Sequence, residues 1–345
     1  MSGALRVSPA DLADGAADGP LLDGDGTVRD PLIVVDLGED ADAATLRAAA
    51  RKARDGDRLL VGVLHGDGEA TELRRALDLT LTLPGGGTGR ETIGVADLDA
   101  ALRELHDAAA RNPLASLVLR DVLRATETMP VPAALDVESY AYSTLLGGRE
   151  FARWLDARGP RPLPPEVQDP VLAVRGDRAL RITLNRPARR NAYGRQVRDA
   201  LVDALQIALA DRDIERVVLD GAGTAFCAGG DLDEFGTAPD LATAHMIRTR
   251  AGAGRLVHRL AGRTEARVHG PCVGAGIEIP AFAGTLVAAP GATFRLPEVS
   301  MGLIPGAGGT VSIPRRIGRW RTLHLALTGA GIGVEQARSW GLVDR

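Results

Sequence analysis

The sequence has 345 residues, which at about 150 residues per domain is enough for two domains. Its 41 basic and 45 acidic side chains leave a net charge of −4, which argues against a surface for nucleic acid or anionic lipid spread over the whole protein. Aromatic side chains make up 3% of the residues, too few for a stacking platform for bases or sugars, and two cysteines cannot form a disulfide framework.

The first 90 residues fall into two parts. Residues 1–30 are rich in Gly, Asp and Ala and lack the apolar segment of a secretion signal, so they are predicted to be a flexible leader. Residues 31–90 contain two β-branched runs around a helix-forming segment at 43–54, which predicts a small α/β unit. Its glycine-rich end, 84–90, is interpreted as a linker because its spacing does not match a phosphate-binding loop.

Residues 91–160 change to a helical pattern. Apolar side chains recur on one face of three segments, the last of which extends to Trp154. The proline-rich stretch 159–165 then marks the clearest domain boundary. The longest apolar stretch of the chain, 273–289, is interrupted by glycines, a proline and a glutamate, so we expect no membrane span and a cytoplasmic protein.

Residues 166–345 alternate between strand and helix patterns. This alternation predicts an α/β core with ligand-binding loops at the junctions from strand to helix. The expected strands lie at 178–184, 216–219, 266–269 and 285–289, and the expected helices at 197–208 and 242–260.

Two of these junctions are rich in glycine. Residues 225–232 have the sequence AFCAGGDL, and residues 269–278 have the sequence HGPCVGAGIE. Neither matches the dinucleotide-binding motif G-x-G-x-x-G. Small residues there let backbone N–H groups approach a ligand oxygen, and two such donors converging on one carbonyl would form an oxyanion hole. Tight turns alone would also explain the glycines of either loop.

Two glutamates lie close to these loops in the sequence. Glu278 is in the first turn of the helix after the second loop, and Glu298 follows the predicted strand 293–296. Alone, the first would only complement the helix dipole and the second would be an exposed loop acid. As a pair beside an oxyanion hole they suit the addition or removal of water across an activated double bond, one as base towards water and the other as proton donor to carbon. Cys227 and Cys272 have no histidine placed by a motif to activate them, and they are interpreted as small buried residues.

Five stretches in the second half of the chain resemble, in the same order, the motifs of the crotonase (enoyl-CoA hydratase/isomerase) superfamily. The resemblance implies an α/β fold with the ββα spiral core of that family, and an acyl-CoA thioester as substrate. It implies no metal, and no cofactor other than the coenzyme A of the substrate. The stretches are LNRPARRNA at 184–192, AFCAGGDL at 225–232, GAGIE at 274–278, FRLPE at 294–298 and GLIPGAGGT at 302–310.

The resemblance also implies roles for single residues. The thioester carbonyl would lie between the N–H groups of Gly230 and Ala275, the adenine beside Ala228, and a catalytic water near Gly306. Both glutamates typical of the hydratases are present, which favours hydration of a 2-enoyl-CoA or the reverse dehydration. A double-bond isomerase, and a non-catalytic acyl-CoA-binding or scaffold protein, are the alternatives.

The sequence departs from the family pattern at the predicted phosphate site. Family members often have a lysine after the first loop, where this chain has Asp233 and Glu234. Arginines must therefore bind the CoA phosphates if the resemblance holds. The candidates are Arg186, Arg189 and Arg190.

A second departure concerns the order of the segments. Family members continue past a Gly-Leu-Val motif, here at 341–343, into three helices that cover the active site and build trimers. The segment 91–160 resembles such a tail, placed before the core at 166–345 instead of after it. Residues 31–90 would then be the remnant of an upstream core, and an unrelated helical domain is the alternative. The resemblance implies a homo-oligomer of the trimer or hexamer type, with the helices packed on their own core or on that of a neighbouring subunit.

Overall fold

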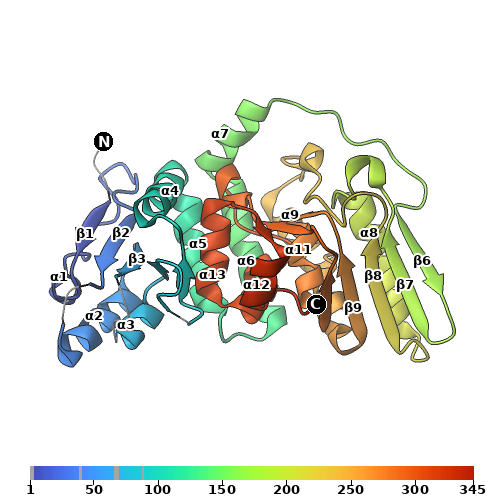
Figure 1. The fold of residues 1–345 in the computed structure, drawn as a ribbon. Coiled ribbons are helices and arrows are strands. Elements are labelled where there is room, and N and C mark those ends of the chain that lie inside the picture. Colours follow the sequence, from blue (N-terminus) through green and yellow to red (C-terminus); the bar gives the residue numbers. More distant parts are fainter. Residues whose placement is uncertain (1–3, 39–40, 66–69, 88) are drawn as a thin grey trace.

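The computed structural model describes residues 4–38, 41–65, 70–87 and 89–345. Two β-sheets lie at opposite ends of the molecule, with helices between them (Figure 1). The N-terminal half of the chain forms one sheet and the C-terminal half forms the other. One hydrophobic core extends from Leu32 to Val343, so the two halves share it.

The N-terminal sheet consists of parallel strands in the order of the sequence, β1-β2-β3-β4-β5. Its central strands are almost wholly buried, as is typical of a parallel sheet that is covered on both faces. The strands are β1 (Leu5–Val7), β2 (Leu32–Asp36), β3 (Leu59–Leu64), β4 (Leu79–Thr82) and β5 (Thr92–Gly94), and the helices among them are α1 (Pro9–Ala13), α2 (Ala43–Asp55) and α3 (Thr71–Ala76).

The N-terminal residues form regular structure, which corrects the prediction of a flexible leader. β1 pairs with β2, with Leu5 opposite Ile33. Ser8 begins α1 through a capping box, in which the side chains of Ser8 and Asp11 each bind the other residue's backbone N–H. Composition concealed these elements because each is too short to produce a periodic apolar pattern.

Four helices connect the two sheets. The sequence predicted three, because the third apolar pattern continues across Gly147 and Gly148, where the structure begins a new helix. Helices of this segment pack on α12 (Gly309–Ile317) and α13 (Arg319–Thr328), so the segment covers the C-terminal half of the same chain, which is one of the two arrangements that the sequence left open. The four helices are α4 (Leu98–Arg111), α5 (Pro113–Thr126), α6 (Val131–Leu146) and α7 (Arg149–Arg158).

A buried carboxylate joins three parts of the chain. Asp78 has no exposed surface, and it accepts the Leu60 N–H at 2.9 Å. It pairs with Arg124 and Arg120 of α5 at 2.8 and 3.5 Å, and with Arg319 of α13 at 3.8 Å. Loss of one partner from a buried ionic cluster leaves an uncompensated charge, so this cluster holds the N-terminal sheet against both helices.

The C-terminal half carries the second large sheet, in the order β11-β9-β8-β7-β6, in which only β6 is antiparallel. The strands predicted here are present with shifted ends. The helix predicted at 242–260 is two helices, because Gly252 lies between them and glycine is unfavourable inside a helix. The elements are β6 (Val171–Arg175), β7 (Ala179–Leu184), β8 (Arg216–Gly221), β9 (Thr264–Val268), β11 (Thr285–Ala288), α8 (Arg195–Ala210), α9 (Leu241–Arg250) and α10 (Gly254–Arg259).

A small sheet lies next to this one, and two of its strands precede Glu278 and Glu298 in the chain. Its order is β10-β12-β13, with β10 parallel and β13 antiparallel to β12. The elements are β10 (Pro271–Val273), α11 (Ala275–Glu278), β12 (Thr293–Arg295), a short 3-10 helix (Glu298–Met301), β13 (Ile332–Gly333) and α14 (Val334–Trp340).

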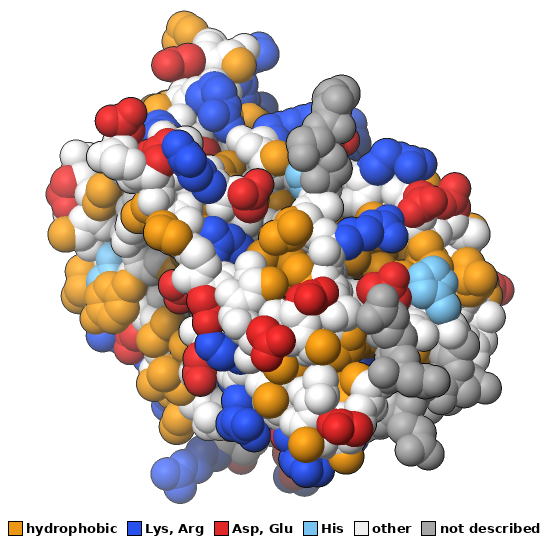
Figure 2. Space-filling view, turned by 90° about the vertical axis from the view of Figure 1, so that its left-hand side faces the viewer, with side chains coloured by type: hydrophobic (Ala, Val, Ile, Leu, Met, Phe, Trp, Pro, Cys, Tyr) orange, Lys and Arg blue, Asp and Glu red, His pale blue; other side chains and the backbone are white. Residues whose placement is uncertain are grey.

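The surface carries charges of both signs. On the face shown in Figure 2, acidic and basic side chains alternate with scattered apolar ones. Among the residues that the structure describes, no helix is both long enough and apolar enough to cross a membrane.

Candidate active site

The two glycine-rich loops lie side by side. Cys227 of the first loop and Cys272 of the second form an isolated parallel bridge, and the Val273 N–H donates to the Cys227 carbonyl at 3.1 Å. A Cβ at Gly276 would lie 2.0 Å from that carbonyl oxygen, so the close approach of the loops requires glycine there.

Each loop presents one N–H group at this crossing. Within the described residues, the N–H groups of Gly230 and Ala275 have no hydrogen-bond acceptor. Ala275 is the first residue of α11, a position where the backbone N–H has no partner inside the helix. Both groups can therefore donate to a ligand oxygen, as an oxyanion hole requires, and their joint action on one carbonyl stays a prediction.

Asn191, which the sequence analysis did not single out, fixes the shape of the first loop. Its side chain accepts the Arg186 N–H at 2.7 Å and donates to the carbonyls of Ala222 and Ala225 at 2.8 and 2.9 Å. Its φ of 55° is in the left-handed region, which asparagine tolerates better than most residues. The available signal was an asparagine near the end of the stretch 184–192, which follows a strand.

Glu278 is buried, with 2% of its surface exposed, at the end of α11. Its Oε2 accepts the N–H groups of Ala307 and Gly309 at 2.7 and 2.9 Å, at the N-terminus of α12. Burial raises the pKa of Glu278 to about 7, although these two N–H groups act in the opposite direction. Near neutral pH the side chain can therefore both hold and release a proton.

Glu298 is the second buried carboxyl and lies against the same glycine. A Cβ at Gly274 would lie 2.4 Å from Glu298 Oε1 and 3.6 Å from Glu278 Oε1. Glu298 Oε2 is buried without a hydrogen-bond partner in the described part of the chain. Burial, followed by the charge of Glu278, raises the pKa of Glu298 well above its usual value, which favours the protonated form.

Two residues of α6 belong to this cluster, and the sequence analysis did not assign them to it. The carboxylate of Glu138 accepts the Gly308 and Thr310 N–H groups. The Tyr142 ring covers Gly306, where a Cβ would lie 2.3 Å from the ring edge. The available signal for Glu138 was an acid on the apolar face of a helix, one turn after Ala134 and one turn before Tyr142.

The three predicted phosphate-binding arginines differ in their surroundings. Arg186 is 4% exposed and pairs with Asp231 at 3.3 Å, so it does not fit the predicted contact with a solvated phosphate. Arg189 pairs with Asp231 and Asp233, both at 2.6 Å, which would have to be broken for it to bind a phosphate. Arg190 is exposed.

Arg190 also lies next to the predicted adenine site. Its carbonyl accepts the Ala228 N–H at 3.0 Å, so Ala228 and Arg190 are adjacent through the backbone. Of the three arginines, only Arg190 is exposed to solvent, as the predicted contact with a solvated phosphate requires.

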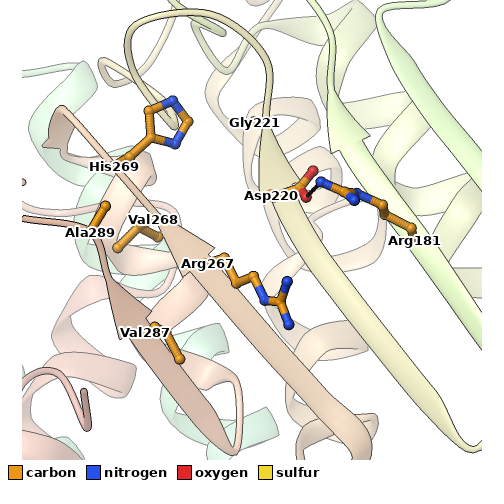
Figure 3. A pocket seen from close by; sticks show the side chains of 8 residues that line it. All are labelled: Arg181, Asp220, Gly221, Arg267, Val268, His269, Val287 and Ala289. Carbon is orange, nitrogen blue, oxygen red and sulfur yellow. Dashed lines mark ion pairs between the residues drawn. The ribbon is translucent and has the colours of Figure 1, made fainter.

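Two surface pockets lie near the edges of this region. One, of about 370 Å³, lies between the end of α7 and the first loop, and Arg158, Arg161 and Phe235 are among its lining residues. The other, of about 340 Å³, is on the large C-terminal sheet, where Arg181 pairs with Asp220 at the strand surface (Figure 3). None of the predicted site residues lines the second pocket.

The two cysteines agree with the structural interpretation rather than with a nucleophilic role. Both thiols are buried, and burial raises the pKa of Cys227 to about 12 and that of Cys272 still further. A thiol of this kind is almost entirely protonated at neutral pH. Within the described residues, no group of three His, Cys, Asp or Glu side chains is arranged to hold a metal ion.

The family model for enoyl-CoA hydratase/isomerase matches residues 176–345 of this chain. The 2,3-dehydroadipyl-CoA hydratase of Escherichia coli (strain K12) is 36% identical over 177 residues, which are 50% of this chain and 68% of that enzyme. The chain belongs to this family. Its α/β core is the crotonase core of the family, and an extra region precedes it.

Other relatives of this crotonase-family chain are named for different reactions. The mevalonyl-coenzyme A hydratase SIDH of Beauveria bassiana (strain ARSEF 2860) is 36% identical over 52% of this chain and 68% of its own length. The 1,2-epoxyphenylacetyl-CoA isomerase of Escherichia coli (strain K12) is 36% identical over 47% of this chain and 63% of its own length. The family therefore includes both hydratases and isomerases at similar distance from this chain.

Proposed function

We propose that the protein adds water to a 2-enoyl-CoA thioester, or catalyses the reverse dehydration. The observation that carries this proposal is the placement of two buried carboxyls, Glu278 and Glu298, against Gly274. The N–H groups of Gly230 in the first loop and of Ala275, which directly follows that glycine, have no acceptor among the described residues.

The contacts of the two glutamates suggest different roles. Glu278 accepts two N–H groups at the N-terminus of α12, and these contacts stabilise its ionised form. It therefore acts as the base towards water. Glu298 has an oxygen without a donor in the described residues and a strongly raised pKa, so it acts as the proton donor to carbon.

The proposed reaction balances with these groups alone. Glu278 takes a proton from water, the water oxygen bonds to C3, and the electron pair of the double bond moves onto the thioester oxygen. That oxyanion is stabilised by the N–H groups of Gly230 and Ala275. C2 then takes the proton of Glu298, and transfer of a proton from Glu278 to Glu298 restores both carboxyls. Gly306 is proposed to position the water, beneath the Tyr142 ring.

The nucleotide end of the substrate is proposed to lie at the outer rim of the first loop. Ala228 and Arg190 are adjacent there, and Arg190 is exposed. The pocket beside the same loop offers Arg158 and Arg161, of which Arg158 already pairs with Asp233 at 2.5 Å. Cationic side chains of this kind suit phosphate groups.

The direct test is steady-state hydration of a panel of short- and long-chain 2-enoyl-CoA esters, followed by loss of the conjugated absorbance and identification of the 3-hydroxyacyl product. An isomerase would instead interconvert 2-enoyl and 3-enoyl esters without incorporating water. A binding or scaffold protein would bind the esters in calorimetry without converting them, and that result would contradict the proposal.

The activity should depend on pH in a bell-shaped manner. Glu278 must be ionised and Glu298 protonated, so kcat/KM should rise as pH increases through about 7, the raised pKa of Glu278, and fall at higher pH as Glu298 loses its proton. The profile is measured from about pH 5 to about pH 10, the range in which such groups titrate. A rate that falls steadily from acid to neutral pH would contradict these assignments.

Loss of one oxyanion donor should also reduce the rate strongly. Gly230→Pro removes the N–H and is expected to lower kcat by about 10²–10³-fold. Gly230→Ala is the matched control, because it keeps the N–H but places a Cβ 2.9 Å from the Phe235 ring. If both variants lose activity equally, the loss comes from the contact with Phe235, and the loop does not supply an oxyanion donor.

A further inference from the structure

Four consecutive backbone N–H groups at the start of α12, those of residues 307–310, point alternately to two carboxylates. The N–H groups of 308 and 310 donate to Glu138 at 2.8 and 2.9 Å. Those of 307 and 309 donate to Glu278 at 2.7 and 2.9 Å. One turn of backbone therefore connects Glu278 directly to a side chain of α6.

We propose that Glu138 is a positioning residue for Glu278: it holds residues 308 and 310 so that the N–H groups of residues 307 and 309 face Glu278. The proposal rests on the proposed function, in which Glu278 is the base. Glu138 lies outside residues 176–345, so the extra N-terminal region would complete the site of the family core.

The contacts of Glu138 are more extensive than those of a simple helix cap. The side chain is 2% exposed, and the Thr310 hydroxyl adds a third hydrogen bond at 2.7 Å. Burial, followed by the charge of Glu278, raises the pKa of Glu138 to about 8, above that of Glu278. Glu138 therefore still holds its proton at the pH where Glu278 loses its own, and it acts through its contacts with the backbone.

The groups that face this pair come from several elements. Glu298 lies beside Glu278, Tyr142 is one turn along α6, and Arg248 of α9 is the cation nearby. The Arg248 guanidinium lies 4.6 Å from the centre of the Tyr142 ring and donates to Ser139 Oγ at 3.1 Å. Arg248 is therefore held by neutral partners of α6, and it does not form an ion pair with either carboxylate in the described residues.

The variant Glu138→Ala removes the contacts that hold residues 307–310. It takes away the acceptor of the Gly308 and Thr310 N–H groups, and we expect kcat to fall by about 10–100-fold as this turn loses its position. Glu278 would then lose the two N–H groups that lower its pKa, so the acid limb of the kcat/KM profile should move to higher pH. Glu138→Gln keeps an amide oxygen for one backbone N–H and an amide donor for the Thr310 hydroxyl, so it should restore part of the rate.

Glu150→Ala is the matched control. Glu150 of α7 is 3% exposed and caps α5 in the same manner, accepting the N–H groups of Leu114 and Ala115 at 2.8 and 3.0 Å. Its loss should lower the melting temperature to a similar extent as Glu138→Ala without moving the pH profile. Thr310→Val provides a second, milder variant: it removes one of the contacts between Glu138 and the start of α12, and should shift the profile in the same direction by less.

The titration of Glu278 is also measured without turnover, as the infrared carboxyl band that disappears in Glu278→Gln. An upward shift of this titration in Glu138→Ala, with no shift in Glu150→Ala, is the expected result. Equal loss of stability in these two variants with unchanged titrations would show that Glu138 only caps α12, and the proposal would fall. If Glu138→Ala does not fold, Thr310→Val decides by the same criterion. Absence of enoyl-CoA conversion by the unaltered protein would refute the proposed function, while the infrared titration would still test the contact between the two carboxyls.

Discussion

Replacement of either glutamate by glutamine, Glu278→Gln or Glu298→Gln, is expected to lower the rate of enoyl-CoA hydration by about 10²–10⁴-fold, the usual contribution of a positioned acid or base. Both side chains are buried against Gly274, and glutamine has nearly the same size, so the surrounding packing should persist. The measurement is kcat and KM on the best substrate of the panel.

The two variants should fail for different reasons. A glutamine at 278 cannot remove a proton from water, although its amide oxygen can still accept the Ala307 and Gly309 N–H groups as Oε2 does. A glutamine at 298 cannot donate an acidic proton to carbon. Binding of a saturated acyl-CoA, measured by calorimetry, should remain within a few-fold of the unaltered protein in both cases. Near-normal hydration by either variant would rule out the two-carboxylate mechanism.

The two loops and the two glutamates could be predicted from local sequence. Gly230, Ala275, Glu278 and Glu298 stand in short contiguous motifs at the ends of strands, and such segments keep their local geometry wherever the strand is placed. Pairing of β10 with β12 then brings the second loop and Glu298 together. The alternation of strands and helices predicts that loops of this kind meet, but it does not show which strands pair.

The features that the sequence did not anticipate depend mostly on contacts between distant segments. The sequence does not show that Arg186 is buried against Asp231, 45 residues away, and an arginine near a glycine loop is equally compatible with a phosphate contact. Glu138 and Gly308 are separated by 170 residues, and the pattern around Glu138 shows only an acid on an apolar helix face. Short elements such as β1 and α1 were missed because they gain their stability from pairing and capping, which composition does not report.

Removal of the N-terminal half should also have a large effect, on both solubility and activity. A shortened protein beginning at Pro165 is expected to be insoluble or inactive. Leu323, Leu325 and Leu327 of α13 are each at most 3% exposed, and α13 packs on α4, α5 and β4, all of which would be absent. Exposure of leucines costs about 1.5–3 kcal/mol each, and a patch of this kind promotes aggregation. The start of α12 would also lose Glu138.

A second shortened protein, beginning at Val95, separates the helices from the N-terminal sheet. It keeps α4–α7, and within the described residues no hydrogen bond or ion pair to Glu278 or Glu298, the proposed catalytic glutamates, comes from the segment it lacks. It loses Asp78, however, so that Arg120, Arg124 and Arg319 remain at the interface without their carboxylate. We therefore expect it to be less stable in urea than the full chain, but to retain enoyl-CoA conversion where the protein beginning at Pro165 does not. Full activity of the Pro165 protein would show instead that the helices are an accessory domain, and that the core completes its site without Glu138.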